Sequence, residues 1–126
     1  MNANEIYDKY NNCIVTVITK IKDEVYSYGS GFLISENGYV VTSGHNCIDS
    51  ESITVLYNDS LYKTSLIKID KRTDIAVLKI KSNILFNFLS FSNEYTVKSG
   101  NICYILGNHA DSAQCICQIG NVKFEK

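Results

Sequence analysis

Histidine is scarce in this 126-residue chain, which has only two, and one of them stands where chemistry is feasible. Residues 39–47 read YVVTSGHNC, so His45 follows directly on a short run of strand-forming residues. An imidazole exchanges protons near neutral pH, and a strand end would hold it at the edge of a cleft. Taken alone, a histidine after a strand is more often a surface or packed residue. An aspartate before a strand, as Asp74 is, is more often a turn or cap residue.

The elements that would position these side chains are short and strand-like. Residues 5–10 could form a single helical turn before two asparagines break it. The following runs are rich in β-branched residues and separated by turns; they cover 13–20, 25–35, 39–43, 52–57, 61–69 and 74–80. Six such runs without a sustained helical period predict an all-β fold, a small antiparallel barrel or sandwich.

Two turn sequences separate these strands with particular clarity. Asn37 and Gly38 are expected to supply the two positive-φ residues of a tight hairpin, and Asn58 and Asp59 give a second hairpin signal. Both turns connect runs that would lie antiparallel. The turns therefore favour neighbouring strands that pair in sequence order.

The rest of the chain divides into a connection and a second unit. We expect the first barrel, with its N-terminal helical turn, to cover 1–80, and a connecting segment with apolar anchors to cover 81–99. Two further strands, at 101–106 and 115–122, belong to a remaining segment at 100–126. The unpaired edges of these two strands predict self-association or binding of a complementing chain.

Composition excludes several classes of function. Twelve basic and 13 acidic residues are scattered along the chain, which argues against nucleic-acid binding and a polybasic membrane patch. No apolar run approaches the roughly 18 residues of a membrane-spanning helix. Five cysteines, with no disulfide-scaffold spacing and no visible secretory leader, predict a reducing, cytoplasmic location.

Three motifs in a fixed order resemble a known family. The segments GSGFLISENGYVVTSGHN at 29–46, TDIAVLKI at 73–80 and SGNICYILGN at 99–108 resemble the N-terminal part of the trypsin-like serine peptidases, particularly their HtrA/DegP branch. The resemblance implies a trypsin-like antiparallel β-barrel. It also implies that the first six-stranded barrel is complete and that 100–126 begins a second one.

The resemblance assigns roles to two residues. In a Ser-His-Asp site, His45 would be the general base and Asp74 the carboxylate that orients it, for hydrolysis of peptide bonds in a polypeptide substrate. His45 follows the third predicted strand and Asp74 precedes the sixth, so the intervening hairpin can bring them together. The family's Gly-x-Ser-Gly-Gly turn carries the nucleophile and oxyanion hole, and the 126 residues contain no such motif. No cofactor or metal is implied.

Three residues invite comparison with the absent nucleophile. Ser99 precedes Gly100 but occupies the place where the family's second barrel opens, remote from the site. Ser43 is more readily explained by packing, and Cys47 by burial of a free thiol. None of them replaces the family's serine turn.

Two cysteines on a predicted strand suggest other chemistry. Cys115 and Cys117 would place both sulfur atoms on one face, most simply a buried face. Some viral members of the fold use a cysteine nucleophile, but AQCICQIG lacks the glycine-flanked turn that would expose one. A metal site with Cys103 and His109 is an alternative, although one Cys-x-Cys pair is a weak zinc signature.

Three functions therefore stay open from the sequence. The chain is the N-terminal part of a serine-type endopeptidase whose remaining barrel, with the nucleophile, is encoded downstream or was lost by truncation. Alternatively, it is an inactive barrel that binds peptides or proteins through a strand edge, or it carries a metal or thiol site. A Gly-x-Ser-Gly-Gly sequence encoded downstream would favour the peptidase. A monodisperse folded chain would favour the binding barrel, and stoichiometric zinc would favour the metal site.

Overall fold

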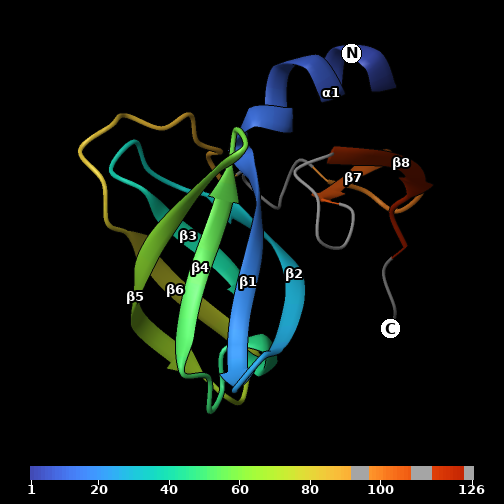
Figure 1. The fold of residues 1–126 in the computed structure, drawn as a ribbon. Helices are drawn as coiled ribbons and strands as arrows, with labels where there is room; N and C mark the ends of the chain where they lie inside the picture. The colour runs from blue at the N-terminus through green and yellow to red at the C-terminus, as the bar shows by residue number, and fades with distance from the viewer. Residues whose placement is uncertain (92–96, 109–114, 124–126) are drawn as a thin grey trace.

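The computed structural model describes residues 1–91, 97–108 and 115–123 (Figure 1). The elements run in the order α1 (Ala3–Tyr10), a 3₁₀ turn (Asn11–Cys13), β1 (Ile14–Lys22), β2 (Val25–Leu33), β3 (Tyr39–Ser43), a second 3₁₀ turn η2 (Gly44–Asn46), β4 (Ser52–Tyr57), β5 (Ser60–Asp70), β6 (Ile75–Ile80), β7 (Ile102–Asn108) and β8 (Cys115–Asn121). Strands dominate, which confirms the predicted all-β class. Neither the length nor the hydropathy of any described helix suffices to cross a membrane.

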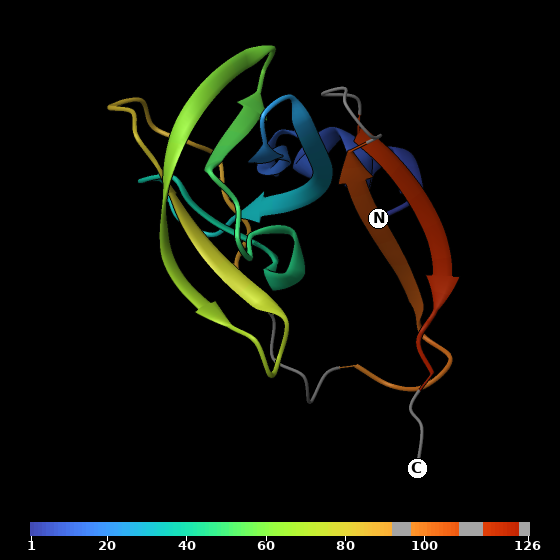
Figure 2. The ribbon, with the colours of Figure 1, turned by 60° about the horizontal axis from the view of Figure 1, so that its bottom comes forward.

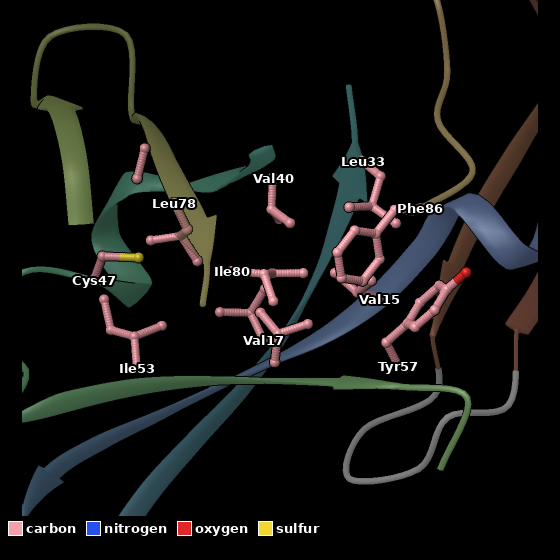
Figure 3. Close-up of a cluster of buried hydrophobic side chains, with 12 residues drawn as sticks. Val15, Val17, Leu33, Val40, Cys47, Ile53, Tyr57, Leu78, Ile80 and Phe86 are labelled. Carbon is pink, nitrogen blue, oxygen red and sulfur yellow. The ribbon is translucent and has the colours of Figure 1, made fainter. Parts of the chain in front are cut away.

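The first six strands close into one antiparallel barrel, in the spatial order β1-β2-β3-β6-β5-β4. Alternate residues of each strand point inward, as the pleat requires. The barrel interior is filled by branched aliphatic side chains that are fully or almost fully buried, among them Val15, Val17, Leu33, Val40, Val55, Leu78 and Ile80 (Figure 3). The six predicted strands are confirmed, and their packed interior gives a rigid support for whatever lies at the barrel's ends.

One predicted hairpin turn is confirmed and the other is wrong in detail. Asn58 and Asp59 both have left-handed backbones, with φ of 48° and 63°, as a two-residue hairpin requires. Between β2 and β3 only Gly38 has positive φ, at 92°, whereas Asn37 does not. The Gly38 N–H instead donates to the carbonyl of Ser35 at 3.2 Å, so the connection is a longer loop with a turn inside it.

The N-terminal helix starts earlier than the sequence interpretation placed it. The Asn2 side chain accepts the Glu5 N–H at 2.9 Å, and the Glu5 carboxylate reaches back to the Asn2 N–H, forming a capping box. Helix α1 therefore begins at Ala3 and continues into a 3₁₀ turn at Asn11. The expected helical turn at 5–10 is part of this longer helix.

The segment after β6 lies over one end of the barrel. Phe86 is 4% exposed and packs edge-on against Tyr57, and its N–H donates to the carbonyl of Glu36 at 3.0 Å. Leu89 donates to the carbonyl of Leu33 at 2.8 Å. The apolar anchors predicted for the connection are thus present in its described part. The boundaries at 80 and 99 stay predictions.

Strands β7 and β8 form a separate two-stranded sheet beside the barrel, next to β1 and β2 (Figure 2). Asn108, at the end of β7, makes the junction. Its N–H donates to Ser30 Oγ on β2 at 2.8 Å, and its side-chain amide donates to Thr16 Oγ1 on β1 at 3.0 Å. The sheet is consistent with the expected start of a second barrel, which stays a prediction.

Candidate active site

The pairing of β3 with β6 brings the two predicted site residues together. Ser43, the last residue of β3, lies opposite Ile75, the first residue of β6. His45 follows Ser43 by two positions, in the turn η2, and Asp74 immediately precedes Ile75. The imidazole Nδ1 of His45 lies 2.7 Å from Oδ2 of Asp74. The predicted pair therefore exists as a direct side-chain contact.

Asp74 holds the turn η2 through both its side-chain carboxylate and its backbone carbonyl. The His45 N–H donates to Asp74 Oδ1 at 2.6 Å, and the Gly44 N–H donates to the Asp74 carbonyl at 2.9 Å. Asp74 has a left-handed backbone with φ of 58°, a conformation that aspartate tolerates better than most residues. The two residues are thus joined by side-chain and main-chain hydrogen bonds at once.

Electrostatics favour one arrangement of protons in this pair. The hydrogen bond from the His45 side chain, followed by that from its N–H, lowers the pKa of Asp74, and these effects outweigh the opposing desolvation. An ionised carboxylate only accepts, so a neutral His45 carries its proton on Nδ1 and leaves Nε2 as an acceptor. Nε2 is therefore the nitrogen that can take a proton from a third group.

That third group is not supplied by the described residues. No hydroxyl or thiol in the described ranges hydrogen-bonds the His45 imidazole. Ser43 lies in β3, and Ser99 is exposed before β7. Cys47 is 2% exposed within the barrel core, and burial raises the pKa of its thiol, so it is the buried free cysteine that the sequence predicted.

The remaining cysteines do not form one cluster. Cys115 and Cys117 share a face of β8, as predicted, because they lie opposite Asn108 and Leu106. Cys103 lies opposite Gly120 and therefore on the other face of the sheet, so the three thiols cannot meet. His109 lies outside the described residues. Within the described ranges, no group of three or more histidine, cysteine or acidic side chains could hold a metal ion.

A cavity of about 440 Å³ adjoins Asp74. It is lined by Asp74 and by both apolar and hydroxylated side chains, namely Ser30, Phe32, Val41, Thr42, Ser43, Ile75 and Phe91. Phe91 is 75% exposed and Ile75 is 46% exposed. The cavity next to Asp74 thus presents apolar surface to solvent, from β6 and from the segment that follows it.

Comparison with known proteins decides the family. Residues 29–125 match the family model described as a trypsin-like peptidase domain. The chain belongs to the trypsin-like peptidase family. This trypsin-like chain is 40% identical over 81 residues to a probable periplasmic serine endoprotease DegP-like protein of Rhizobium meliloti (strain 1021). Similar proteins of Chlamydia pneumoniae and Bartonella henselae (strain Houston 1) are 42% identical over 81 residues and 36% identical over 83 residues.

Each match covers a large share of this chain but a small share of the relative. They span 64%, 64% and 65% of this chain, but 16% of each relative. They support the HtrA/DegP branch and a serine endopeptidase-like domain, as the sequence motifs indicated. The activity of the whole relatives is a separate matter, because this chain spans only about a sixth of their length.

The predicted cytoplasmic location is wrong by the same comparison. All three relatives are named as periplasmic endoproteases. That prediction depends on five cysteines without a disulfide-scaffold spacing and on the N-terminal residues. Cys13, Cys47 and Cys115 are buried, so these thiols reflect packing rather than a redox compartment.

Proposed function

We propose that this chain carries the acid–base half of a serine endopeptidase active site. His45 acts as general base toward a serine, Asp74 orients it, and the serine and oxyanion hole come from polypeptide outside these 126 residues. The observation that carries the proposal is the 2.7 Å contact between His45 Nδ1 and Asp74 Oδ2. A polypeptide would be the substrate, in keeping with the endoprotease names of the relatives.

The chemistry follows from the proton arrangement of the pair. Nε2 of His45 removes the proton from the serine hydroxyl as the oxygen attacks the peptide carbonyl, and later delivers it to the leaving amine. Asp74 stays ionised throughout and stabilises the imidazolium that forms. Without a nucleophile or oxyanion donors, the pair by itself would retain almost none of this rate enhancement.

The surroundings of the pair support completion by further polypeptide. The His45 and Asp74 side chains are 66% and 50% exposed, so water screens their interaction in the free chain. A polypeptide that fills the adjoining cavity would cover Phe91 and Ile75 and exclude this water. Electrostatic stabilisation is strongest in such a water-poor site.

A second candidate function rests on a different surface. The two-stranded sheet β7-β8 exposes isoleucines from both strands; they are Ile102, Ile105, Ile116 and Ile119. Neither β7 nor β8 pairs with a third strand among the described residues. An inactive barrel that binds an extended peptide along one of these edges would use this sheet.

The relatives also suggest a compartment. Because all three are named periplasmic, we place this chain in the periplasm as well. Free thiols in that oxidising compartment would persist where they are buried, as Cys13 and Cys47 are. Thiol trapping without prior reduction would test this placement at the partly exposed Cys103 and Cys117, which should be oxidised in the periplasm and free in a reducing compartment.

Activity-based labelling tests the proposed function. The protein recovered from its native source is treated with a fluorophosphonate, which reacts with activated serines, and analysed by intact-mass spectrometry. A labelled species heavier than 14.2 kDa, or a labelled partner that copurifies, supports the proposal, and His45→Ala is expected to abolish the label. An unlabelled 14.2 kDa protein alone would favour the binding module instead.

A further inference from the structure

The β7-β8 sheet stands beside the barrel, and Asn108 at the end of β7 joins the two (Figure 2). The Asn108 N–H donates to Ser30 Oγ at 2.8 Å, and its side-chain amide donates to Thr16 Oγ1 at 3.0 Å. Ser30 Oγ in turn donates to the Asn108 carbonyl at 3.3 Å. Thr16 on β1 and Ser30 on β2 lie directly opposite each other in the barrel. One residue of the sheet therefore bridges a single cross-strand pair.

The contact with Thr16 is shielded from water. Val15 and Val17 belong to the barrel core, so Thr16 between them points to the outside of the barrel. Thr16 is nevertheless 0% exposed, because the chain packed against the barrel covers it. Water competes little with a hydrogen bond at such a position. The Asn108 amide thus reaches a well-protected acceptor.

Two separate points of attachment fix the orientation of the sheet. The main-chain hydrogen bonds of Asn108 both involve Ser30, and alone they would let the sheet turn about that one residue. The side-chain bond to Thr16 adds a point on a second strand and prevents this rotation. Tyr104 on β7 also donates to the Met1 carbonyl, but at a longer 3.4 Å and outside the barrel. The Asn108 carboxamide is therefore the group that selects one orientation.

Ser30 connects this bridge to the strand that carries the candidate site. The Thr42 hydroxyl donates to the Ser30 carbonyl at 2.8 Å. Thr42 lies in β3 and is 6% exposed, three residues before His45. Ser30 is thus held at its hydroxyl by Asn108 and at its carbonyl by Thr42. The end of β7 and the end of β3 are fixed to the same residue.

We infer that Asn108 is a positioning residue, which sets the orientation of the β7-β8 sheet on the barrel and so the direction from which polypeptide beyond β8 approaches His45. The second half of this statement rests on the proposed function, because it concerns the segment that would bring the serine. The orientation itself is a property of the described chain. It depends on the side chain of Asn108 and not only on its backbone.

Residual dipolar couplings of backbone amides measure this orientation in a weakly aligned sample. All chains carry Ile105→Lys against self-association, on the opposite face of β7 from Asn108. The barrel and the sheet are expected to share one alignment tensor. Asn108→Leu keeps the approximate shape and also removes Asn108 Oδ1, a buried oxygen without a hydrogen-bond partner among the described residues. This variant should therefore stay folded, but its sheet should lose the tensor of the barrel.

Two further variants identify the contact responsible. Thr16→Val removes the acceptor and should cause the same loss, and the double variant with Asn108→Leu should add nothing further. Asn121→Leu is the matched control. Asn121 also stands at a strand end of the sheet, but its side-chain amide donates to the Gly100 carbonyl at 3.2 Å and not to the barrel. Its sheet should keep the common tensor.

A common tensor retained in folded Asn108→Leu overturns the inference, and so does its absence from the parent or its loss in Asn121→Leu. If Asn108→Leu does not fold, Thr16→Val decides in the same way. In the protein from its native source, Asn108→Leu should slow fluorophosphonate labelling about tenfold or more, because a small misplacement of reacting groups is costly. An unchanged labelling rate overturns the link to His45. Absence of labelling in the unmodified protein, with the orientation changes as expected, would reject the proposed function alone.

Discussion

Ser43 at the end of β3 and Ile75 at the start of β6 lie directly opposite each other in the barrel. This one antiparallel pair determines where the chain leaves both strands, and therefore where His45 and Asp74 meet. The site is assembled from residues 29 positions apart in the chain by a register that the barrel core enforces. Shifting that register by one residue would turn one of the strands inside out.

Removing the carboxylate of Asp74 should disable the assembled peptidase without unfolding it. Asp74→Asn keeps the shape but cannot hold the proton on Nδ1, so the rate of fluorophosphonate labelling should fall by about 10⁴-fold. The barrel should remain folded by circular dichroism. A labelling rate within tenfold of the wild type would contradict the role given to Asp74.

The pH dependence of Asp74 follows from its hydrogen bonds. Because its pKa is lowered in the folded chain, the carboxylate stabilises the fold above the ordinary aspartate pKa of about 3.9, and this contribution disappears as the pH falls through the lower folded value. Carbon-13 titration of the Asp74 carboxyl should show a midpoint below 3.9. The midpoint should rise in His45→Ala, and an unchanged midpoint would show that His45 is not the cause.

Truncating a buried side chain of the barrel core should strongly lower the free energy of unfolding. Leu78, in β6, is 0% exposed, and Leu78→Ala should lower the free energy of unfolding by about 2–5 kcal/mol. Leu61→Ala is a matched control, since Leu61 is 66% exposed, and should change it by about 0.5 kcal/mol or less. Urea denaturation measures both. Equal losses of unfolding free energy in the two variants would contradict the burial of Leu78 in the barrel core.

The junction between β7 and the barrel should loosen when Ser30 loses its hydroxyl. Ser30 Oγ accepts the Asn108 N–H at 2.8 Å and donates to the Asn108 carbonyl at 3.3 Å. Ser30→Ala should therefore speed hydrogen exchange of the Asn108 amide at least several-fold, because a net hydrogen bond of about 1 kcal/mol is lost. Exchange at Val17 in β1 should stay slow. Unaltered exchange at Asn108 would place the junction elsewhere.

The exposed sheet should make the isolated chain self-associate. Ile105 and Ile116 lie on the same face, and neither strand has a third partner among the described residues. Ile105→Lys should shift sedimentation at tens of micromolar toward monomer, while Leu61→Lys on the barrel should not. A compact monomer of the unmodified chain at that concentration would count against both self-association and the unpaired edge.

Sequence patterns predicted the barrel well because local and global preferences agree in it. The β-branched runs, and the two-residue turn at Asn58 and Asp59, specify strands and a hairpin without reference to the rest of the chain. The sequence pattern underestimates the length of helix α1, because the start of the helix depends on the capping box that Asn2 and Glu5 form together. The hairpin after β2 was misjudged because Gly38 alone supplies the positive φ.

The candidate site was predictable only in part. The pairing of His45 with Asp74 came from a family resemblance, and the distance between them needed the strand register. The placement of Cys103 on the opposite face of the sheet from Cys115 and Cys117 depends on the register between β7 and β8.

The closure of β1 to β6 into a barrel has a consequence for how such an enzyme is assembled. The closed barrel β1–β6 holds both His45 and Asp74, and their contact needs no strand from outside the barrel. Under the function proposed above, assembly of the active site then requires only that a serine-bearing segment dock against a pair that is already aligned. The presence or absence of that segment would decide whether the pair takes part in hydrolysis.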